Sequence, residues 1–143
     1  MLDYIVHEGR TLSIIIRANY KANGIEFFTP DDFPQQLAYM NRAKGYSISP
    51  HVHNRIKRHV SNTQEVLYIK SGVVRVDYYD DNKIYLESRL LRSGDVVLLA
   101  YGGHGFFMCE DSEIIEIKQG PYSEGLDKIR FESIHVDQVR VKE

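Results

Sequence analysis

The stretch QEVLYIKSGVVRVDYY, residues 64–79, decides the fold of this 143-residue chain. Two runs rich in Val, Ile, Leu and Tyr stand on either side of Ser71-Gly72, a dipeptide that suits a tight connection between strands. The run before the turn is apolar at odd and even positions alike, which indicates a strand covered on both faces. We therefore predict two tightly joined strands over Gln64–Lys70 and Val73–Tyr79.

Similar short segments recur along the whole chain, and almost no stretch has a helical period. Turn residues at 80–82 and 92–95 separate the next segments, so we expect three successive hairpins in a meander. The predicted strands are Leu12–Arg17, Gly24–Thr29, Leu37–Arg42, Tyr46–His53, Gln64–Lys70, Val73–Tyr79, Lys83–Leu91, Asp95–Tyr101, Phe106–Cys109, Glu113–Lys118 and Ile134–Val141. Helical turns are expected only near 31–37 and 123–130. This pattern predicts a single all-β domain over residues 1–143, a closed barrel or double-sheet jelly roll with little helix.

Composition narrows the class of partner. The chain has 18 basic and 20 acidic residues and a formal net charge of -2, so we expect no nucleic-acid or membrane partner. Its apolar runs are much shorter than the roughly 20 residues that cross a bilayer. The single cysteine, Cys109, and the absence of a signal-like segment after Met1 predict a cytoplasmic protein. We expect Cys109 to be a small buried hydrophobic residue.

A pair of histidines in the predicted strand Tyr46–His53 is the first candidate for chemistry. His51 and His53 are two residues apart, so in a strand both side chains lie on one face, about 7 Å apart along the backbone. Two imidazoles at this spacing can converge on one metal ion. A solvent-facing strand explains an isolated pair equally well.

Two further polar residues stand in apolar surroundings. Glu65 begins a strand at the rim of the predicted core, where an ionised carboxylate needs a cation, a hydrogen-bond network or water. A strand-end glutamate in solvent is the alternative. His104 stands among Gly102, Gly103 and Gly105, which let the backbone bend and another group approach the imidazole. A phosphate cradle is rejected for these glycines because a strand, rather than a helix, follows them.

These residues together resemble the signature motifs of the cupins. Gly45, five residues, His51-Val52-His53, then Glu65, six residues and Gly72 resemble the first cupin motif, G-x5-HxH-x3,4-E-x6-G. Gly94–His104 is similar to the second motif, G-x5-PxG-x2-H-x3-N. The resemblance implies a small β-barrel in which His51, His53, Glu65 and His104 bind one divalent metal ion. Because cupins are commonly dimers, it also implies a homodimer.

The chain departs from the cupin pattern in four respects. Eleven residues separate His53 from Glu65, where the pattern has three or four. His104 comes one residue early, Ala100 replaces the motif's proline, and Met108 stands where asparagine is usual. His59 lies inside the enlarged loop and therefore competes with His51 or His53 as a metal ligand.

Other polar residues are weaker candidates for a site. Arg55, Lys57 and Arg58 of the long loop suit a cationic mouth for a carboxylate or phosphate, or a solvated loop. In EIIEIK, residues 113–118, Glu116 and Lys118 share one face of a strand, and we favour the outer surface over the barrel cavity.

Two adjacent tyrosines are relevant to the expected homodimer, because a second subunit could cover one of them. Tyr78 and Tyr79 precede the turn at 80–82, and one of them is exposed unless another layer or a second subunit covers it.

The metal ligands that the resemblance implies indicate which metal ion and which type of reaction to expect. Three imidazoles and a carboxylate suit one divalent transition metal, Fe, Mn, Ni, Cu or Zn. We expect an enzyme that chelates a small oxygen-rich metabolite, a sugar derivative or keto acid, for isomerisation, epimerisation or oxygen-dependent oxidation. Glu116, Lys118 or Tyr39 serves as general base if it lines the cavity. The alternatives are a non-catalytic protein that binds or senses a small ligand, and a structural cupin with no metal.

Overall fold

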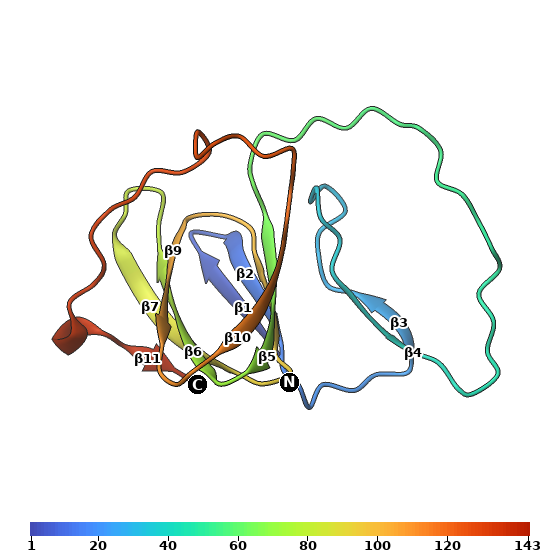
Figure 1. Cartoon of the computed structure of the whole chain (residues 1–143), viewed down its shortest axis with the longest axis horizontal. Coiled ribbons are helices and arrows are strands. Elements are labelled where there is room, and N and C mark those ends of the chain that lie inside the picture. Colours follow the sequence, from blue (N-terminus) through green and yellow to red (C-terminus); the bar gives the residue numbers. More distant parts are fainter.

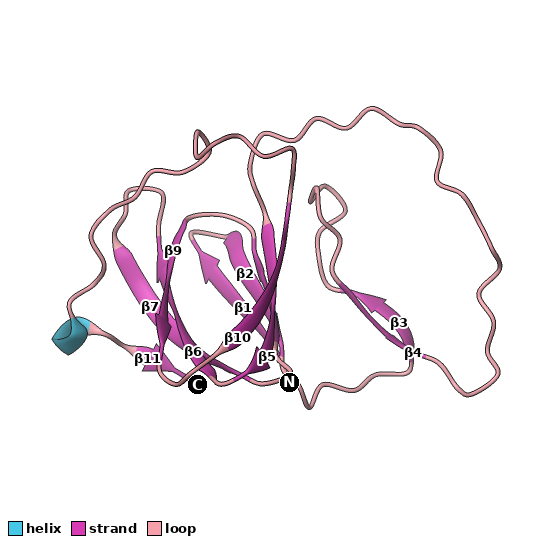
Figure 2. Cartoon of the chain, viewed as in Figure 1, coloured by secondary structure: helices cyan, strands magenta, loops and turns pink.

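The computed structural model describes residues 1–143 and consists of strands joined by turns and long loops (Figure 1). The strands are β1 (Leu2–His7), β2 (Arg10–Ile16), β3 (Gly24–Phe27), β4 (Ala38–Asn41), β5 (Glu65–Ser71), β6 (Val73–Tyr79), β7 (Tyr85–Arg92), β8 (Val96–Leu99), β9 (Gly103–Met108), β10 (Glu113–Lys118) and β11 (Val141–Lys142). The helical content is one 3-10 turn at Val136–Gln138 (Figure 2). The predicted all-β class is confirmed.

The strands form two large sheets and a separate hairpin. One sheet has five strands in the order β1-β2-β8-β5-β10, and the other has four in the order β11-β7-β6-β9. All pairings are antiparallel except that of β11 with β7. Strand β10 is therefore an edge of the first sheet and β9 an edge of the second.

The chain changes sheets at the turns that we expected to close hairpins. Strand β5 pairs with β8 and β10, whereas β6 pairs with β7 and β9. Only β6 and β7 form one of the three expected hairpins, so the predicted meander is wrong. Gly72 has φ +84°, and a Cβ atom there would lie 2.3 Å from the Asp111 carbonyl oxygen. This sharp corner sends β6 into the facing sheet, and a strand that crosses between sheets satisfies the same apolar pattern as a hairpin.

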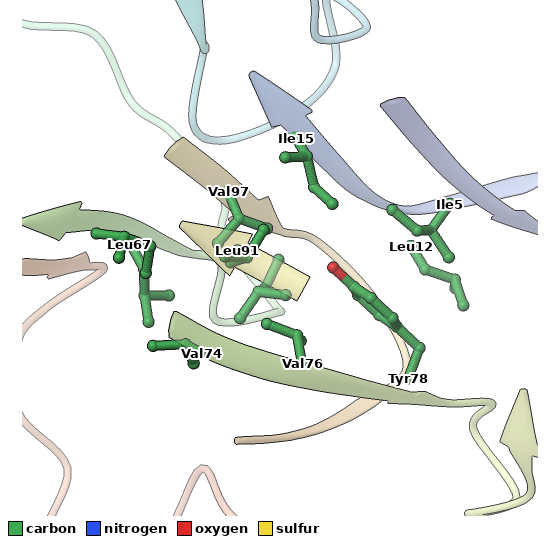
Figure 3. Close-up of a cluster of buried hydrophobic side chains, with 11 residues drawn as sticks. Ile5, Leu12, Ile15, Leu67, Val74, Val76, Tyr78, Leu91 and Val97 are labelled. Carbon is green, nitrogen blue, oxygen red and sulfur yellow. The ribbon is translucent and has the colours of Figure 1, made fainter. Parts of the chain in front are cut away.

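The main core lies between the two sheets. Side chains from β5 and β8 meet those of β6, as Figure 3 shows for Leu67, Val97, Val74, Val76 and Tyr78. The whole cluster is Ile5, Leu12, Ile15, Leu67, Ile69, Val74, Val76, Tyr78, Leu91, Val97 and Leu99. Its residues come from strands far apart in sequence, so the two sheets depend on each other for burial.

The five-stranded sheet also buries its other face. Ile14 and Leu98 are opposite each other in β2 and β8, and both are fully buried. Phe28 and Phe33, from the loop between β3 and β4, cover them. This second cluster explains why the sequence of this sheet is apolar on both faces.

Two predicted strands differ from the structure, and one observed strand was not predicted. The strand expected at Tyr46–His53 is wrong, because residues 46–53 lie in an irregular segment with no neighbouring strand to pair with their backbone groups. The strand expected at Ile134–Val141 is reduced to the 3-10 turn and β11. Strand β1 was missed, although Glu8-Gly9 marks the turn into β2 and both residues have positive φ.

Burial corrects the expectation for Cys109 and decides between the alternatives for the two tyrosines. Cys109 is exposed at the end of β9 rather than buried, because β9 is an edge strand. Tyr78 and Tyr79 are both buried, at 1% and 3% exposure, so neither needs a second subunit to cover it. The structure contains no helix of the length and apolarity needed to span a bilayer.

Candidate functional site

A histidine and a glutamate meet where the two large sheets face each other. Glu65 is the first residue of β5, and His104 is the second residue of β9. His104 lies opposite Tyr78 in the ladder between β6 and β9, so its side chain projects to the same inner face as buried Tyr78. The Nε2 atom of His104 is 3.0 Å from Oε2 of Glu65. The structure therefore brings together two residues that are 39 positions apart.

The hydrogen bond between Glu65 and His104 determines which of the two side chains carries the shared proton. The contact with His104 lowers the pKa of Glu65, against the opposing effect of burial, and the charges of Lys128 and Lys118 act in the same direction. An ionised carboxylate accepts hydrogen bonds only, so the imidazole donates from Nε2. The Nδ1 atom of His104 has no hydrogen-bond partner in the chain. It is thus the nitrogen left to exchange a proton with a ligand.

The pair lines a cavity with a volume of about 840 Å³. Its walls include the inner faces of β5, β9 and β10. Its mouth is covered in part by residues 119–133, which we call the strap and which cross the upper ends of the strands in Figure 1. Aromatic side chains line it at Tyr79, Tyr101, Phe106 and Phe131. A cavity of this size accepts a small metabolite, with aromatic surface for its apolar part and polar groups for its orientation.

Glu116 lines this cavity, so our preference for an outer position is wrong. Glu116 lies opposite Leu67 in the ladder between β10 and β5, and Leu67 belongs to the inner core. Lys118 lies opposite Glu65 on the same face. Its side chain lines a smaller neighbouring pocket, and its Nζ atom is 3.9 Å from Oε1 of Glu116. The prediction that Glu116 and Lys118 share one face of the strand is confirmed, but that face points inward and not to the outer surface.

Glycines shape the chain before His104, as the sequence predicts. Gly102 has φ +72°, and a Cβ atom there would lie 2.4 Å from the carbonyl oxygen of Tyr79. At Gly103 a Cβ atom would lie 2.9 Å from Cζ of Phe131 in the strap. The bend into β9 therefore requires glycine at position 102, whereas a side chain at position 103 would have to displace the Phe131 ring.

The other proposed metal ligands lie elsewhere. His51 and His53 are exposed in the irregular segment between β4 and β5, with ring centroids 5.3 Å apart, and His51 Nδ1 is 2.9 Å from the Ser49 carbonyl oxygen. His59 belongs to the same segment and is also exposed. No three His, Cys, Asp or Glu side chains gather closely enough to hold a metal ion. As placed here, the four predicted ligands do not fit a metal centre.

The cations of the cavity differ from those that the sequence suggested. Arg55, Lys57 and Arg58 are exposed and do not line it. Lys128 and Arg130 of the strap do, and neither side chain has an ion-pair or hydrogen-bond partner in the chain. Sequence reasoning missed both residues, because only the strap's path over the strands gives them a role.

Arg10 lies at the cavity, whereas Tyr39 does not. Arg10 also lines the cavity, but it is bound to Asp81 at 2.8 Å and lies 3.7 Å from the ring centroid of Tyr101. Tyr39, a candidate general base, packs against Tyr20 at a centroid distance of 5.2 Å in the outer cluster, away from the cavity.

Comparisons of the chain with protein family models, with curated proteins and with solved structures found no match.

Proposed function

We propose that this chain is an enzyme that binds a small, oxygen-rich, anionic metabolite and moves a proton on it at the His104–Glu65 pair. The observation that carries the proposal is the 3.0 Å hydrogen bond between these side chains on the wall of the cavity of about 840 Å³. A histidine oriented by a carboxylate is an effective general base, because the carboxylate fixes the tautomer and stabilises the imidazolium that forms.

The arrangement favours isomerisation or epimerisation next to a carbonyl group. The Nδ1 atom of His104 accepts a proton from the carbon beside the carbonyl, and the electron pair of that C–H bond passes to the carbonyl oxygen. For isomerisation the imidazolium returns this proton to the former carbonyl carbon, while the proton of the neighbouring substrate hydroxyl passes to the enolate oxygen and a carbonyl forms at the carbon that first lost its proton. For epimerisation the electron pair returns from the enolate oxygen to the first carbon, which takes a proton from water on its opposite face, and the imidazolium releases its own proton to solvent. Glu65 keeps its negative charge throughout and acts as a positioning residue.

The strap suggests the charge of the substrate. Lys128 and Arg130 line the cavity without an anionic partner, and such cations bind carboxylates or phosphates. A sugar derivative or keto acid with such a group places its anion at the strap and its reactive carbon near His104. The same binding groups support the second candidate, a non-catalytic protein that holds or senses this class of ligand.

The resemblance to cupins adds the proposal of a metal at this cavity. A double-stranded β-helix barrel with one divalent Fe, Mn, Ni, Cu or Zn ion on His51, His53, Glu65 and His104 requires the segment between β4 and β5 to change position. Elemental analysis of untagged protein tests this proposal, because close to one metal per chain that is lost in His51→Ala supports it, and metal-free protein contradicts it.

Hydrogen exchange with solvent tests the enzymatic proposal without knowledge of the product. Keto acids and phosphorylated keto sugars are incubated with protein in D2O, and deuterium at the carbon beside the carbonyl is followed by NMR. We expect exchange on at least one substrate, reduced by about 100-fold or more in His104→Gln. Glu113→Gln, an exposed change outside the cavity, is the control for general damage. Ligand binding with no exchange in the whole panel would instead support the non-catalytic role.

A further inference from the structure

The segment between β4 and β5 has the sequence of a strand but none of its contacts. We call residues 42–62 the arm. All its side chains are exposed, and none of the backbone groups of residues 47–62 bonds to another backbone group. Figure 1 shows the arm looping out beyond β3 and β4, on their side away from the two large sheets. An ordered protein rarely leaves so long a run of peptide groups to water alone.

The arm alternates between apolar and polar residues in the manner of a half-buried strand. Between residues 46 and 61, six of the eight even positions are apolar, at Tyr46, Ile48, Pro50, Val52, Ile56 and Val60, and the other two are Asn54 and Arg58. The odd positions are all polar, at Ser47, Ser49, His51, His53, Arg55, Lys57, His59 and Ser61. In an extended chain these two sets lie on opposite faces. Val52 is 90% exposed and Ile56 is 60% exposed, so the apolar face is uncovered in the single chain.

The molecule also has a strand edge that lacks a partner. β9 pairs with β6 on one side and with nothing on the other. Apolar side chains at this edge are exposed on both faces of the sheet, at Phe106, Phe107 and Met108. A long apolar edge is a template for another strand, and soluble proteins normally cover it.

Charge indicates what kind of chain fits this edge. The arm carries Arg42, Lys44, Arg55, Lys57 and Arg58 and no carboxylate, so the rest of the chain has 13 basic against 20 acidic residues. Glu110 and Asp111 lie two and three residues after the end of β9 and are exposed. Because cations flank residues 46–53 on both sides, either strand direction brings one of them near these two carboxylates.

We propose that this protein is an arm-exchanged homodimer in which the arm of one copy pairs with the free edge of β9 in a second copy. The arm and the edge occur once in each chain, so two equivalent contacts close a two-fold dimer and leave no arm or β9 edge free. The contact supplies partners for the arm's backbone and covers its apolar face. It also covers an edge that borders the proposed active cavity, because Phe106 lines that cavity.

The native Cys109 provides a direct test, because it is the only cysteine and is exposed at the end of β9. Ser49→Cys adds a second thiol in the arm. Copper-phenanthroline removes two electrons and two protons from a nearby pair of thiols to form a disulfide. We expect a covalent dimer on non-reducing gels, with a mass-spectrometric peptide that joins position 49 of one copy to Cys109 of another. The double change Ser49→Cys with Cys109→Ser is the control and should not form this link.

Light scattering after size-exclusion chromatography tests the dimer without cross-linking. We expect wild-type dimers and a dissociation constant raised by about 100-fold or more in Val52→Asp. Ser61→Asp adds the same charge on the polar face and should remain dimeric. A link within one chain, a monomer at all concentrations, or a monomer whose arm binds RNA would each overturn the proposal. None of these results depends on enzymatic exchange, so the proposed function stands or falls separately.

Discussion

Glu65 and His104 belong to different sheets, and their hydrogen bond of 3.0 Å joins the five-stranded sheet to the four-stranded sheet at the cavity. A second polar contact joins the same sheets within the core, between Ser13 of β2 and Tyr78 of β6 at 3.0 Å. The first contact borders open space that a ligand can enter, whereas the second is fully enclosed. We therefore expect the contact between Glu65 and His104 to act on a ligand, and the contact between Ser13 and Tyr78 to contribute to the stability of the fold.

The stability contribution of Glu65 should depend on pH. Its pKa in the folded protein is lowered from 4.5, so the ionised carboxylate stabilises the fold above that value. This stabilisation is lost as the pH falls through the folded pKa, because the folded protein must then take up the proton. We expect Glu65→Gln to be less stable than wild type by about 1–2 kcal/mol near neutral pH, with the difference shrinking toward about pH 2.

Urea unfolding at a series of pH values measures this difference. Glu113→Gln is the matched control, since Glu113 pairs with Lys70 at 2.8 Å on the exposed outer surface. Its effect should stay within about 0.5 kcal/mol at every pH. A stability difference for Glu65→Gln that does not change with pH would show that the carboxylate charge has no part in it.

The free cations of the strap should bind anions. Lys128 and Arg130 line the cavity without an ion-pair or hydrogen-bond partner, so their N–H donors are free to bind an anion. We expect Lys128→Gln or Arg130→Gln to weaken inorganic phosphate binding by about three- to tenfold, and added salt to reduce the difference. NMR titration of the His104 ring signals provides the measurement. Lys21→Gln, an exposed change outside the cavity, should leave the affinity unaltered, and an equal loss there would point to a non-specific charge effect.

The local sequence pattern predicted the position of most strands, but it did not predict which strands pair with each other. Val73–Tyr79 and Glu113–Lys118 have the predicted bounds, because alternation and turn residues are local properties. The pairing of β5 with β8 and β10 depends on the corner at Gly72. A tight turn in sequence fits a hairpin and a change of sheet equally well, so the meander was wrong.

The candidate site was predicted in part for the same reason. Glu65 and His104 were singled out as polar residues in apolar surroundings, and the structure places them together. His51 and His53 depended on a strand at residues 46–53 having a neighbour, which the single chain does not provide. Lys128 and Arg130 could not be predicted, since the strap's position over the cavity follows from tertiary packing.

The contact between Ser13 and Tyr78 should behave as a coupled pair. Burial raises the pKa of Tyr78, so its hydroxyl stays neutral and donates to Ser13 Oγ, which donates in turn to the Leu98 carbonyl oxygen at 2.8 Å. Removal of either hydroxyl leaves the other buried group short of a partner. We expect Tyr78→Phe and Ser13→Ala each to cost about 1–3 kcal/mol. The double variant should cost less than the sum, as measured by urea unfolding, and strict additivity would contradict the coupling.

The bend at Gly102 should tolerate no side chain. Gly102 has φ +72°, and a Cβ atom would lie 2.4 Å from the carbonyl oxygen of Tyr79 on the neighbouring strand. Gly9 has a similar φ of +75° but open space around its Cα atom. Gly9→Ala therefore measures the backbone cost alone, about 1 kcal/mol, whereas Gly102→Ala adds a clash that moves β9 away from β6. We expect Gly102→Ala to lose at least about 2 kcal/mol more in urea unfolding, together with the NMR signature of the His104–Glu65 hydrogen bond. Equal losses in the two variants would show that β9 has room to shift and that the position of His104 does not depend on this glycine.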